Sequence, residues 1–352
     1  MKKILSILPG LLISIIIAII ATLIENILPV HVIGASVIAL FIGMIINHFL
    51  KKDNIFSPGI KFTSKKILKL AIIILGFSLN ISNILYAGKL SLIVMIFTLL
   101  TCFGAGYFIG KGLKLNWKLS NLISAGTGIC GGSAIAAIAP TIEADDTDVA
   151  IAMSATFLFD MAMIVLFPLL GRAIGMTDEA FGIWAGTAVN DTSSVVATGY
   201  AFSEVAGDFA TMVKLTRTLS IIPTVLIFAI IQLNLKKKEN LNNNLNNNEM
   251  KLKFSFVKIF PWFIIGFLLL SVLTTILEPA LSNLNNFSYT NFVKITKNIS
   301  KFLMVSSLAA IGLNTSFKKM KKAGLRPMIH GFIISALVVV VALVVEILLG
   351  LV

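Results

Sequence analysis

The sequence predicts an all-α, polytopic membrane protein with about 11 membrane segments, inverted repeats and two discontinuous or re-entrant helices. Of its 352 residues, 57% are hydrophobic and 13% are charged, and the mean hydropathy is +0.97. A soluble domain carries about 25% charged residues because its surface faces water. Apolar runs long enough to cross a bilayer as helices follow one another along the chain. We therefore expect a single integral membrane domain over residues 1–352.

Nine apolar runs, each bounded by Lys, Asn, Pro or Gly, are the predicted spans: 4–23, 31–50, 67–86, 90–110, 148–170, 209–233, 257–277, 298–316 and 327–350. Two further segments, 119–140 and 179–202, are apolar but rich in Gly, Ser and Thr. The first run is followed by no small-residue cleavage site, so we interpret it as a transmembrane helix rather than a signal peptide. The polar, low-complexity stretch 234–256 is a predicted cytoplasmic linker loop.

The basic residues predict the orientation of the chain. The formal net charge is +13, and the basic residues lie in short runs between apolar spans, as at Lys51-Lys52 and Lys65-Lys66. With a cytoplasmic amino terminus, most of these runs fall on the cytoplasmic side. We therefore expect a multi-pass protein of the cell (inner) membrane, surrounded by the lipid bilayer and without a nucleic-acid partner. The basic runs fall on the same sides of the membrane whether 119–140 and 179–202 both cross it or both enter it and return.

Two internal similarities predict inverted repeats. The sequence around Gly76 matches that around Gly312, 236 positions later, and the predicted topology sends these two spans in opposite directions. A second match, shifted by 60 positions, relates "GTGICGGSAIAA" at 126–137 to "GTAVNDTSSVVA" at 186–197. The predicted repeat regions are 31–170 and 179–350.

The two polar segments predict interrupted helices near the middle of the membrane. Polar groups in hydrocarbon cost several kcal/mol each unless they are satisfied, so such backbone survives only inside protein or beside a watery cavity. Gly lowers helix propensity by roughly 1 kcal/mol, which favours a break at Gly131-Gly132 with Ser133 as the N-cap of a second half-helix. Tight packing of small residues between helices is the alternative for either segment.

Three charged residues lie inside predicted spans. Asp160 is in the middle of "ATFLFDMAMIVLF", where a carboxylate needs a partner or a proton. Lys214 and Arg217 are three residues apart and share one helix face. These two cations either attract an anionic substrate, pair with Asp160 or Asp191, or extend to the membrane interface.

Half-helix amino termini suit anions, whereas unwound carbonyl groups and acidic side chains suit H⁺ or Na⁺. The expected substrate-binding residues are Thr127, Gly128, Gly131, Gly132, Ser133, Thr192, Ser193, Ser194, Lys214 and Arg217. The expected ion-coupling residues are Asn190, Asp191 and Asp160, with Na⁺ as a candidate coupling ion and no other cofactor or metal. In the second segment the N-cap candidates are Asn190, Asp191, Thr192 and Ser193.

The motifs "GTGICGGSAIAAIAP" and "GTAVNDTSSVVATGYAFSE", with "GLRPMIHG" near the end, resemble the YeiH-like family, to which sulfate export has been ascribed. The resemblance covers nearly the whole chain. That family is grouped with the cation:proton antiporter and anion transporter superfamily, which implies inverted repeats, a core domain with two discontinuous helices and a scaffold domain. Carried over by position, the core motifs are Thr127 to Ser133 and Asn190 to Ser194.

We therefore expect a secondary active transporter, an exporter or antiporter, of a small inorganic or organic anion such as sulfate or sulfite. It would be coupled to H⁺ or Na⁺, work by alternating access and be a candidate homodimer. No G-x-x-x-x-G-K-[ST] or H-E-x-x-H motif occurs, so neither an ATP-driven pump nor a zinc protease is supported. A membrane-embedded enzyme using Asp160 and Asp191, and a passive anion channel, are the alternatives.

Overall fold

The computed structural model describes residues 6–27, 35–49, 55–242, 261–282, 289–315 and 324–352. Every regular element in these ranges is helical, which confirms the predicted all-α class. Five of the described helices are long and apolar enough to cross a membrane: Leu8–Ile27, Ile81–Gly112, Thr147–Ile174, Glu204–Leu235 and Leu325–Leu348. The apolar helices Ala35–Phe49 and Trp262–Leu277 are shorter. A polytopic membrane protein follows from these lengths and compositions.

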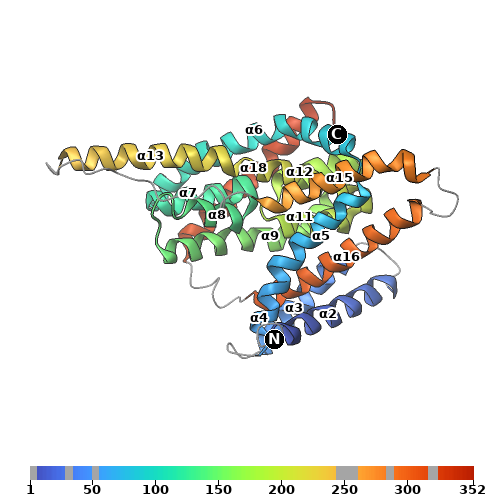
Figure 1. Cartoon of the computed structure of the whole chain (residues 1–352). Helices are drawn as coiled ribbons and strands as arrows, with labels where there is room; N and C mark the ends of the chain where they lie inside the picture. The colour runs from blue at the N-terminus through green and yellow to red at the C-terminus, as the bar shows by residue number, and fades with distance from the viewer. Residues whose placement is uncertain (1–5, 28–34, 50–54, 243–260, 283–288, 316–323) are drawn as a thin grey trace.

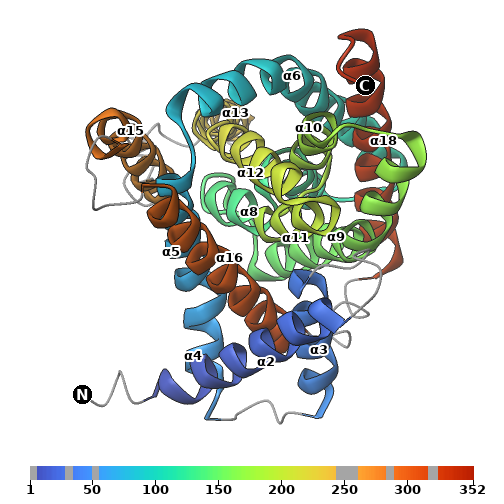
Figure 2. The ribbon, with the colours of Figure 1, turned by 90° about the vertical axis from the view of Figure 1, so that its right-hand side faces the viewer.

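The helices form two bundles that lie side by side (Figures 1 and 2). The scaffold bundle contains α2 (Leu8–Ile27), α3 (Ala35–Phe49), α4 (Ser57–Phe62), η1 (Thr63–Ile67), α5 (Leu68–Leu75), η2 (Gly76–Ser78), α15 (Trp262–Ser282) and α16 (Tyr289–Asn314). The core bundle contains α6 (Ile81–Gly112), α7 (Trp117–Ala125), η3 (Gly126–Cys130), α8 (Gly132–Ile138), α9 (Asp146–Ile174), α10 (Asp178–Ala188), α11 (Thr192–Phe202), α12 (Glu204–Thr218), α13 (Ile221–Asn242) and α18 (Leu325–Leu348).

Glycines allow the scaffold helices to approach closely. A Cβ added at Gly312 of α16 would lie 2.1 Å from the Leu40 carbonyl oxygen of α3, and one at Gly43 of α3 would lie 2.4 Å from the Ala309 carbonyl oxygen of α16. Small residues give membrane helices this close backbone contact, because lipid offers no hydrophobic drive for association. The α3–α16 pair is therefore the centre of the scaffold bundle.

A second pair of scaffold helices repeats this contact. A Cβ at Gly76 would lie 2.4 Å from the Phe267 carbonyl oxygen of α15, and one at Gly266 of α15 would lie 3.1 Å from the Ile73 side chain. Gly76 and Ile73 correspond to Gly312 and Ala309 under the shift of 236 positions. The inverted repeat remains a prediction, and these matched contacts support it.

The segment at 119–140 enters the core bundle and returns to the side from which it came. Asn116, just before α7, donates from Nδ2 to both carboxylate oxygens of Asp148 in the first turns of α9, at 3.2 and 3.1 Å. Lys118 Nζ donates to the Glu143 carbonyl oxygen at 2.6 Å. The start and end of the segment are therefore neighbours, and residues 116–145 form what we call the first hairpin.

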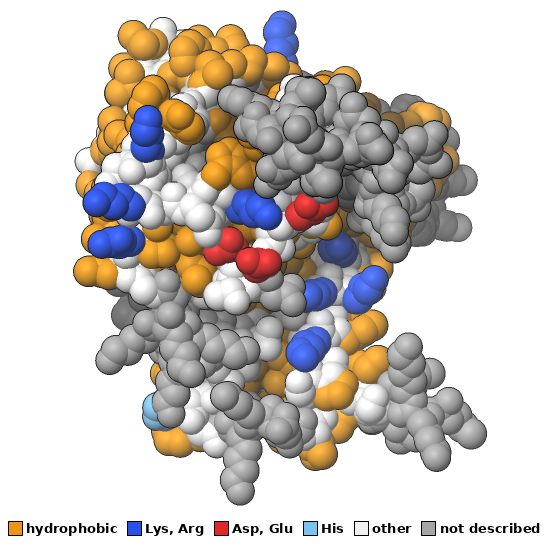
Figure 3. Space-filling view, turned by 90° about the vertical axis from the view of Figure 1, so that its left-hand side faces the viewer, with side chains coloured by type: hydrophobic (Ala, Val, Ile, Leu, Met, Phe, Trp, Pro, Cys, Tyr) orange, Lys and Arg blue, Asp and Glu red, His pale blue; other side chains and the backbone are white. Residues whose placement is uncertain are grey.

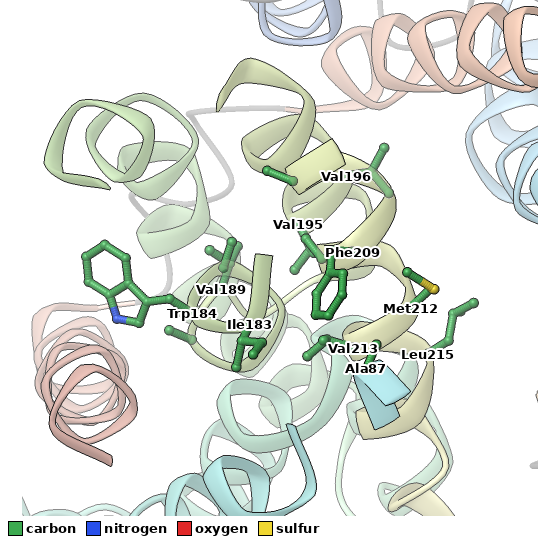
Figure 4. Close-up of a cluster of buried hydrophobic side chains, with 14 of the residues drawn as sticks. Ala87, Ile183, Trp184, Val189, Val195, Val196, Phe209, Met212, Val213 and Leu215 are labelled. Carbon is green, nitrogen blue, oxygen red and sulfur yellow. The ribbon is translucent and has the colours of Figure 1, made fainter. Parts of the chain in front are cut away.

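The segment at 179–202 is also a hairpin. Its first residues lie beside its last, because Ser203 Oγ donates to Asp178 Oδ1 at 2.7 Å and Arg172 donates to the Phe202 carbonyl oxygen at 3.0 Å. Its two legs, α10 and α11, both pack on α12, where side chains such as Trp184, Val195 and Phe209 belong to one buried apolar cluster (Figure 4). Residues 178–203 are the second hairpin.

The two hairpins enter the core bundle from opposite faces, because α9 runs between the end of the first and the start of the second. We call the side that carries Lys111, Lys114 and Lys118 the basic face, and the other side the opposite face. Several Lys and Arg side chains are visible in the view of Figure 3. The sequence left crossing and returning open for both segments, and the structure shows that both return.

The structure corrects two predicted boundaries. The predicted span 67–86 is wrong at its end, because η2 ends at Ser78 and α6 begins at Ile81. Asn80 separates them: its backbone is extended, and its side chain accepts a 2.8 Å hydrogen bond from the Ser82 amide as the N-cap of α6. The predicted linker 234–256 starts too early, since α13 continues to Asn242 through Leu, Lys and Glu residues that favour helix. Residues 243–256 of that linker lie outside the described part of the chain.

The close α3–α16 contact predicts a large difference between two Gly→Ala variants. Gly312→Ala should lower the free energy of unfolding by about 1–3 kcal/mol, because its Cβ would meet backbone of α3 that cannot move aside. Gly104→Ala on α6 is the matched control, since nothing lies within 4 Å of its added Cβ. Thermal unfolding of the two variants in detergent measures the difference, and equal melting temperatures would contradict the described packing.

Candidate functional site between the two hairpin tips

The tips of the two hairpins touch inside the core bundle. Gly131, at the tip of the first hairpin, has φ +63°, a conformation that L side chains rarely adopt. A Cβ added there would lie 2.9 Å from Cβ and from Oδ1 of Asp191, at the tip of the second hairpin. The predicted break at Gly131-Gly132 is confirmed, and glycine is required there by both the backbone conformation and the close contact.

At the first tip, no described side chain caps the second half-helix, α8. The π-helical turn η3 ends where the Gly131 amide donates to the Gly126 carbonyl oxygen at 2.8 Å, and Gly131 is itself the N-cap of α8. The prediction that Ser133 is this N-cap is wrong, since Ser133 lies inside α8. The reason is that Gly131 already reverses the chain, so the helix begins two residues earlier than expected. Ser133 is exposed and Gly132 is half-buried.

The second tip is capped by its own aspartate. Asp191 is the N-cap of α11, as one of the four predicted candidates, and its Oδ2 accepts the Ser193 amide at 2.9 Å. The Ser193 hydroxyl donates to the same oxygen. Asp191 and Thr192 are half-buried, whereas Ser193 and Ser194 are buried. Ser193 is therefore committed to the cap, and Ser194 lies on the buried face of α11.

Asp160 of α9 holds the same tip from outside the hairpin. Its carboxylate is fully buried, with Oδ1 accepting the Asn190 amide and Oδ2 accepting the Asp191 amide, both at 2.9 Å. A carboxylate placed on free amides at a helix amino terminus is favoured by charge-assisted hydrogen bonds and by the helix dipole. Asp160 and Asp191 therefore already occupy three amides at the start of α11.

Arg217 of α12 connects the two tips. Its Nε donates to the Gly128 carbonyl oxygen at 2.6 Å and its Nη2 to the Thr127 carbonyl oxygen at 2.5 Å. Its Nη1 donates to the Val189 carbonyl oxygen, in the other hairpin, at 3.3 Å. These carbonyl groups lie at the carboxyl ends of the two inbound legs. The last carbonyl groups of a helix have no partner within the helix and carry partial negative charge, which a cation can satisfy.

Lys214, one turn earlier on α12, donates from Nζ to the same Val189 carbonyl oxygen at 2.8 Å. Lys214 and Arg217 are both 0% exposed. The alternative that these cations extend to the membrane interface is therefore wrong. Their charge is instead placed at the carboxyl ends of the inbound legs, while Asp160 and Asp191 are placed at the amino end of α11.

Two polar atoms at the tips have no hydrogen-bond partner in the described part of the chain. Thr127 Oγ1 and Asn190 Oδ1 are both buried and unpaired there. The side-chain nitrogen of Asn190 does have partners, since Nδ2 donates to the Thr156 carbonyl oxygen at 3.4 Å and to Ser335 Oγ of α18 at 3.3 Å. An unpaired buried oxygen at a hairpin tip is available to a water, a proton donor or a solute.

The sequence prediction missed Thr156 and Ser335. The sequence gives little indication of Ser335, because a single serine in the apolar run of α18 is as consistent with helix packing as with a binding role. The structure brings together Thr127, Gly128, Gly131, Asn190, Asp191, Asp160, Lys214 and Arg217, and it leaves Gly132, Ser133 and Thr192 at the accessible edge of the tips.

Comparison with known proteins places the chain in a family. The family model described as "Conserved hypothetical protein 698" matches residues 9–331. A UPF0324 membrane protein of Clostridium tetani is 54% identical over 345 residues, which are 97% of each chain. A UPF0324 membrane protein of Fusobacterium nucleatum is 40% identical over 311 residues, 85% of this chain and 86% of the relative. A third, from Streptococcus agalactiae, is 40% identical over 347 residues, 97% of each chain.

These relatives match over 85% or more of each chain and are named as membrane proteins, in agreement with the apolar helices and with the resemblance to YeiH-like proteins. The chain therefore belongs to the UPF0324 family and is an integral membrane protein.

Proposed function

We propose that this protein is a secondary active transporter that exports or exchanges a small anion, such as sulfate or sulfite, in a cycle coupled to H⁺ or Na⁺. The observation that carries the proposal is the meeting of two opposed hairpins at Gly131 and Asp191 inside the core bundle. Interrupted helices at membrane depth occur where they are buried in protein or line a cavity, and in transporters they form the substrate site. The surrounding groups are two acids and two bases, so the buried centre is formally neutral before an anion binds.

The accessible edge of the tips is where we place the anion. Ser133 and Thr192 offer hydroxyl donors there, and α8 begins at Gly132 without a side-chain cap. The amides of Asn190, Asp191 and Ser193 already donate to carboxylates, so the amino end of α11 is the less suitable of the two. Lys214 and Arg217 would act through their positive potential, because their hydrogen bonds go to backbone carbonyl groups.

The coupling ion would be carried by Asp191 rather than Asp160. Both oxygens of Asp160 accept backbone amides and its side chain is 0% exposed, so it positions the second tip. Asp191 is half-buried, and its hydrogen bonds within the described residues all go to Oδ2, which leaves Oδ1 toward Gly131. Asn190 Oδ1 and Thr127 Oγ1 supply further unpaired oxygens near the same tips.

Alternating access would follow from movement of the core bundle against the scaffold bundle. Transporters with repeats move one bundle as a nearly rigid body around a fixed site, and here the whole site lies in core helices. The proposal includes the cell (inner) membrane, a cytoplasmic amino terminus placed by the basic runs, and a candidate homodimer.

The alternative of an aspartyl-type enzyme has less support. Two catalytic carboxylates must share and activate a water, but both oxygens of Asp160 already accept hydrogen bonds from the backbone of Asn190 and Asp191. A passive channel differs from the proposal in one measurable respect, since its flux would be unaffected by the collapse of H⁺ and Na⁺ gradients.

Asp191→Asn tests the coupling role. The variant keeps an N-cap, because Asn caps helices as well as Asp does, but it removes the charge. In proteoliposomes, uptake of radiolabelled sulfate or sulfite driven by a pH or Na⁺ gradient should fall to background, while expression and melting temperature stay close to those of the parent protein. Asp145→Asn, at an exposed loop position, is the control and should retain transport. Gradient-driven uptake unchanged in Asp191→Asn would refute the assignment.

Asp160→Asn tests the positioning role. An amide at this position can accept only one of the two backbone hydrogen bonds and would turn a donor toward the other. We expect a loss of about 1–3 kcal/mol of stability, seen as a melting temperature clearly below that of Asp191→Asn. A melting temperature equal to that of the parent protein would show that the amides of the second tip do not depend on Asp160.

Arg217→Gln separates the two roles of the cation. Because the guanidinium group pairs with carbonyl groups of both hairpins, its removal should destabilise the protein as well as weaken anion binding. Arg217→Lys keeps the positive charge but loses the planar set of donors. Thermal unfolding with and without sulfate should show both variants destabilised, with the stabilisation by sulfate retained only in Arg217→Lys. Equal sulfate stabilisation in both variants would contradict a role for the charge.

A further inference from the structure

A group of charged side chains joins the two bundles at the opposite face. Lys297 of α16 forms an ion pair with Asp208 of α12, with 2.7 Å between Nζ and Oδ2. The hydroxyl group of Tyr200, on α11, donates to the other oxygen of Asp208 at 2.6 Å. One turn away, Lys301 of α16 pairs with Glu204 at the start of α12, at 3.1 Å. Scaffold helix α16 is thus tied directly to α12, and through Asp208 to Tyr200 of the second hairpin.

The two ion pairs differ in burial. The side chains of Lys297 and Asp208 are 26% and 12% exposed, whereas that of Glu204 is 60% exposed. Exposed ion pairs contribute little because water and salt screen them, so the Lys301–Glu204 pair is a weak contact. The Lys297–Asp208 pair is shielded, and Tyr200 and Lys297 use both oxygens of the carboxylate. We call Tyr200, Asp208 and Lys297 the latch.

Apolar side chains close the same region between the bundles. Ala197 and Ala201 of α11 share a buried cluster with Val37 and Leu40 of α3 and with Leu308 of α16. Ala201 is only 4% exposed, because it lies on the helix face that packs against the scaffold. The second hairpin is therefore covered by the scaffold bundle.

The first hairpin is not covered in this way. The main neighbours of α8 are α7, η3, α9 and α13, all of which belong to the core bundle. Ser133 and Ala136, one turn apart on α8, are exposed. The exposed edge of the tip region therefore lies on the side of the first hairpin, and the two ends of this hairpin lie at the basic face.

We propose that this structure is the state in which the site is open toward the basic face, and that the latch closes the opposite face and must separate before that face can open. The inference rests on the proposed transport function, because only an alternating-access cycle needs both states. A moving core bundle would carry Tyr200 and Asp208 away from Lys297, which is fixed to the scaffold. The latch would therefore set the balance between the two states.

Cysteine labelling with a membrane-impermeant maleimide tests the proposal without measuring transport. Ser133→Cys reports on the basic face and Ala201→Cys on the opposite face, each placed in an otherwise unchanged protein. The natural Cys102 and Cys130 are free and buried, so the parent protein gives the background. In sealed vesicles of each orientation, Ser133→Cys should react from the basic face only, and Ala201→Cys should react weakly from either face.

Removing the latch should shift this pattern. Adding Lys297→Gln should raise labelling of Ala201→Cys from the opposite face several-fold and lower labelling of Ser133→Cys, whereas Lys297→Arg should keep the parent pattern. Lys294→Gln, an exposed lysine one turn earlier on α16, is the matched control and should change nothing. Asp208→Asn removes the charge that pairs with Lys297 and should cause a shift in the same direction, so it is the second variant if Lys297→Gln does not fold.

Two outcomes would overturn the proposal. One is labelling of Ser133→Cys from the opposite face in the protein with an intact latch. The other is an unchanged labelling pattern in folded Lys297→Gln and Asp208→Asn. A latch-dependent shift without any gradient-driven anion uptake would instead reject the proposed transport function, while showing that the latch controls which face of the protein is accessible.

Discussion

The structure depends on how the broken backbone at the two hairpin tips is satisfied away from water. Each interruption leaves carbonyl groups at the end of the inbound leg and amides at the start of the returning one. Arg217 and Lys214 pair with the carbonyl groups of Thr127, Gly128 and Val189, and Asp160 pairs with the amides of Asn190 and Asp191. Buried charges are costly unless they are paired, so these groups and the breaks require one another.

This requirement also divides the molecule. All the groups that hold the tips come from core helices, so the core bundle can keep its site intact while its contacts with the scaffold change. Contacts between the bundles are of a different kind, namely an apolar cluster around Ala197 and Ala201 and the ion pairs of Lys297 and Lys301. The tip contacts, by contrast, are buried hydrogen bonds to charged groups, which are costly to break. The proposed movement of the core bundle against the scaffold would therefore leave the tip contacts unbroken.

The sequence was sufficient for the positions of the breaks, because Gly131-Gly132 and Asn190-Asp191 conflict with an uninterrupted apolar helix. It could not show that both segments return, since charge counting gives the same answer for a crossing pair and a returning pair. It identified Asp160, Lys214 and Arg217 as unusual, but not their partners, which are backbone atoms and carry no sequence signal. The prediction of Ser133 as the cap was wrong because Gly131, with its positive φ, is the N-cap two residues earlier. The end of the third span was missed because the break at Asn80 lies inside an apolar run.

The central claim is that Asp160 and Arg217 hold the second tip as one unit, and a double-mutant cycle measures this directly. The two residues pair with the backbone of adjacent residues, at Asn190 and Val189. Once one of them is removed and the tip is released, removing the other should cost less. Unfolding free energies of Asp160→Asn, Arg217→Gln and the double variant should therefore be non-additive by at least about 0.5 kcal/mol. Additive losses would mean that the two residues act on independent parts of the fold, and the description of the tips as one charge-satisfied centre would then be wrong.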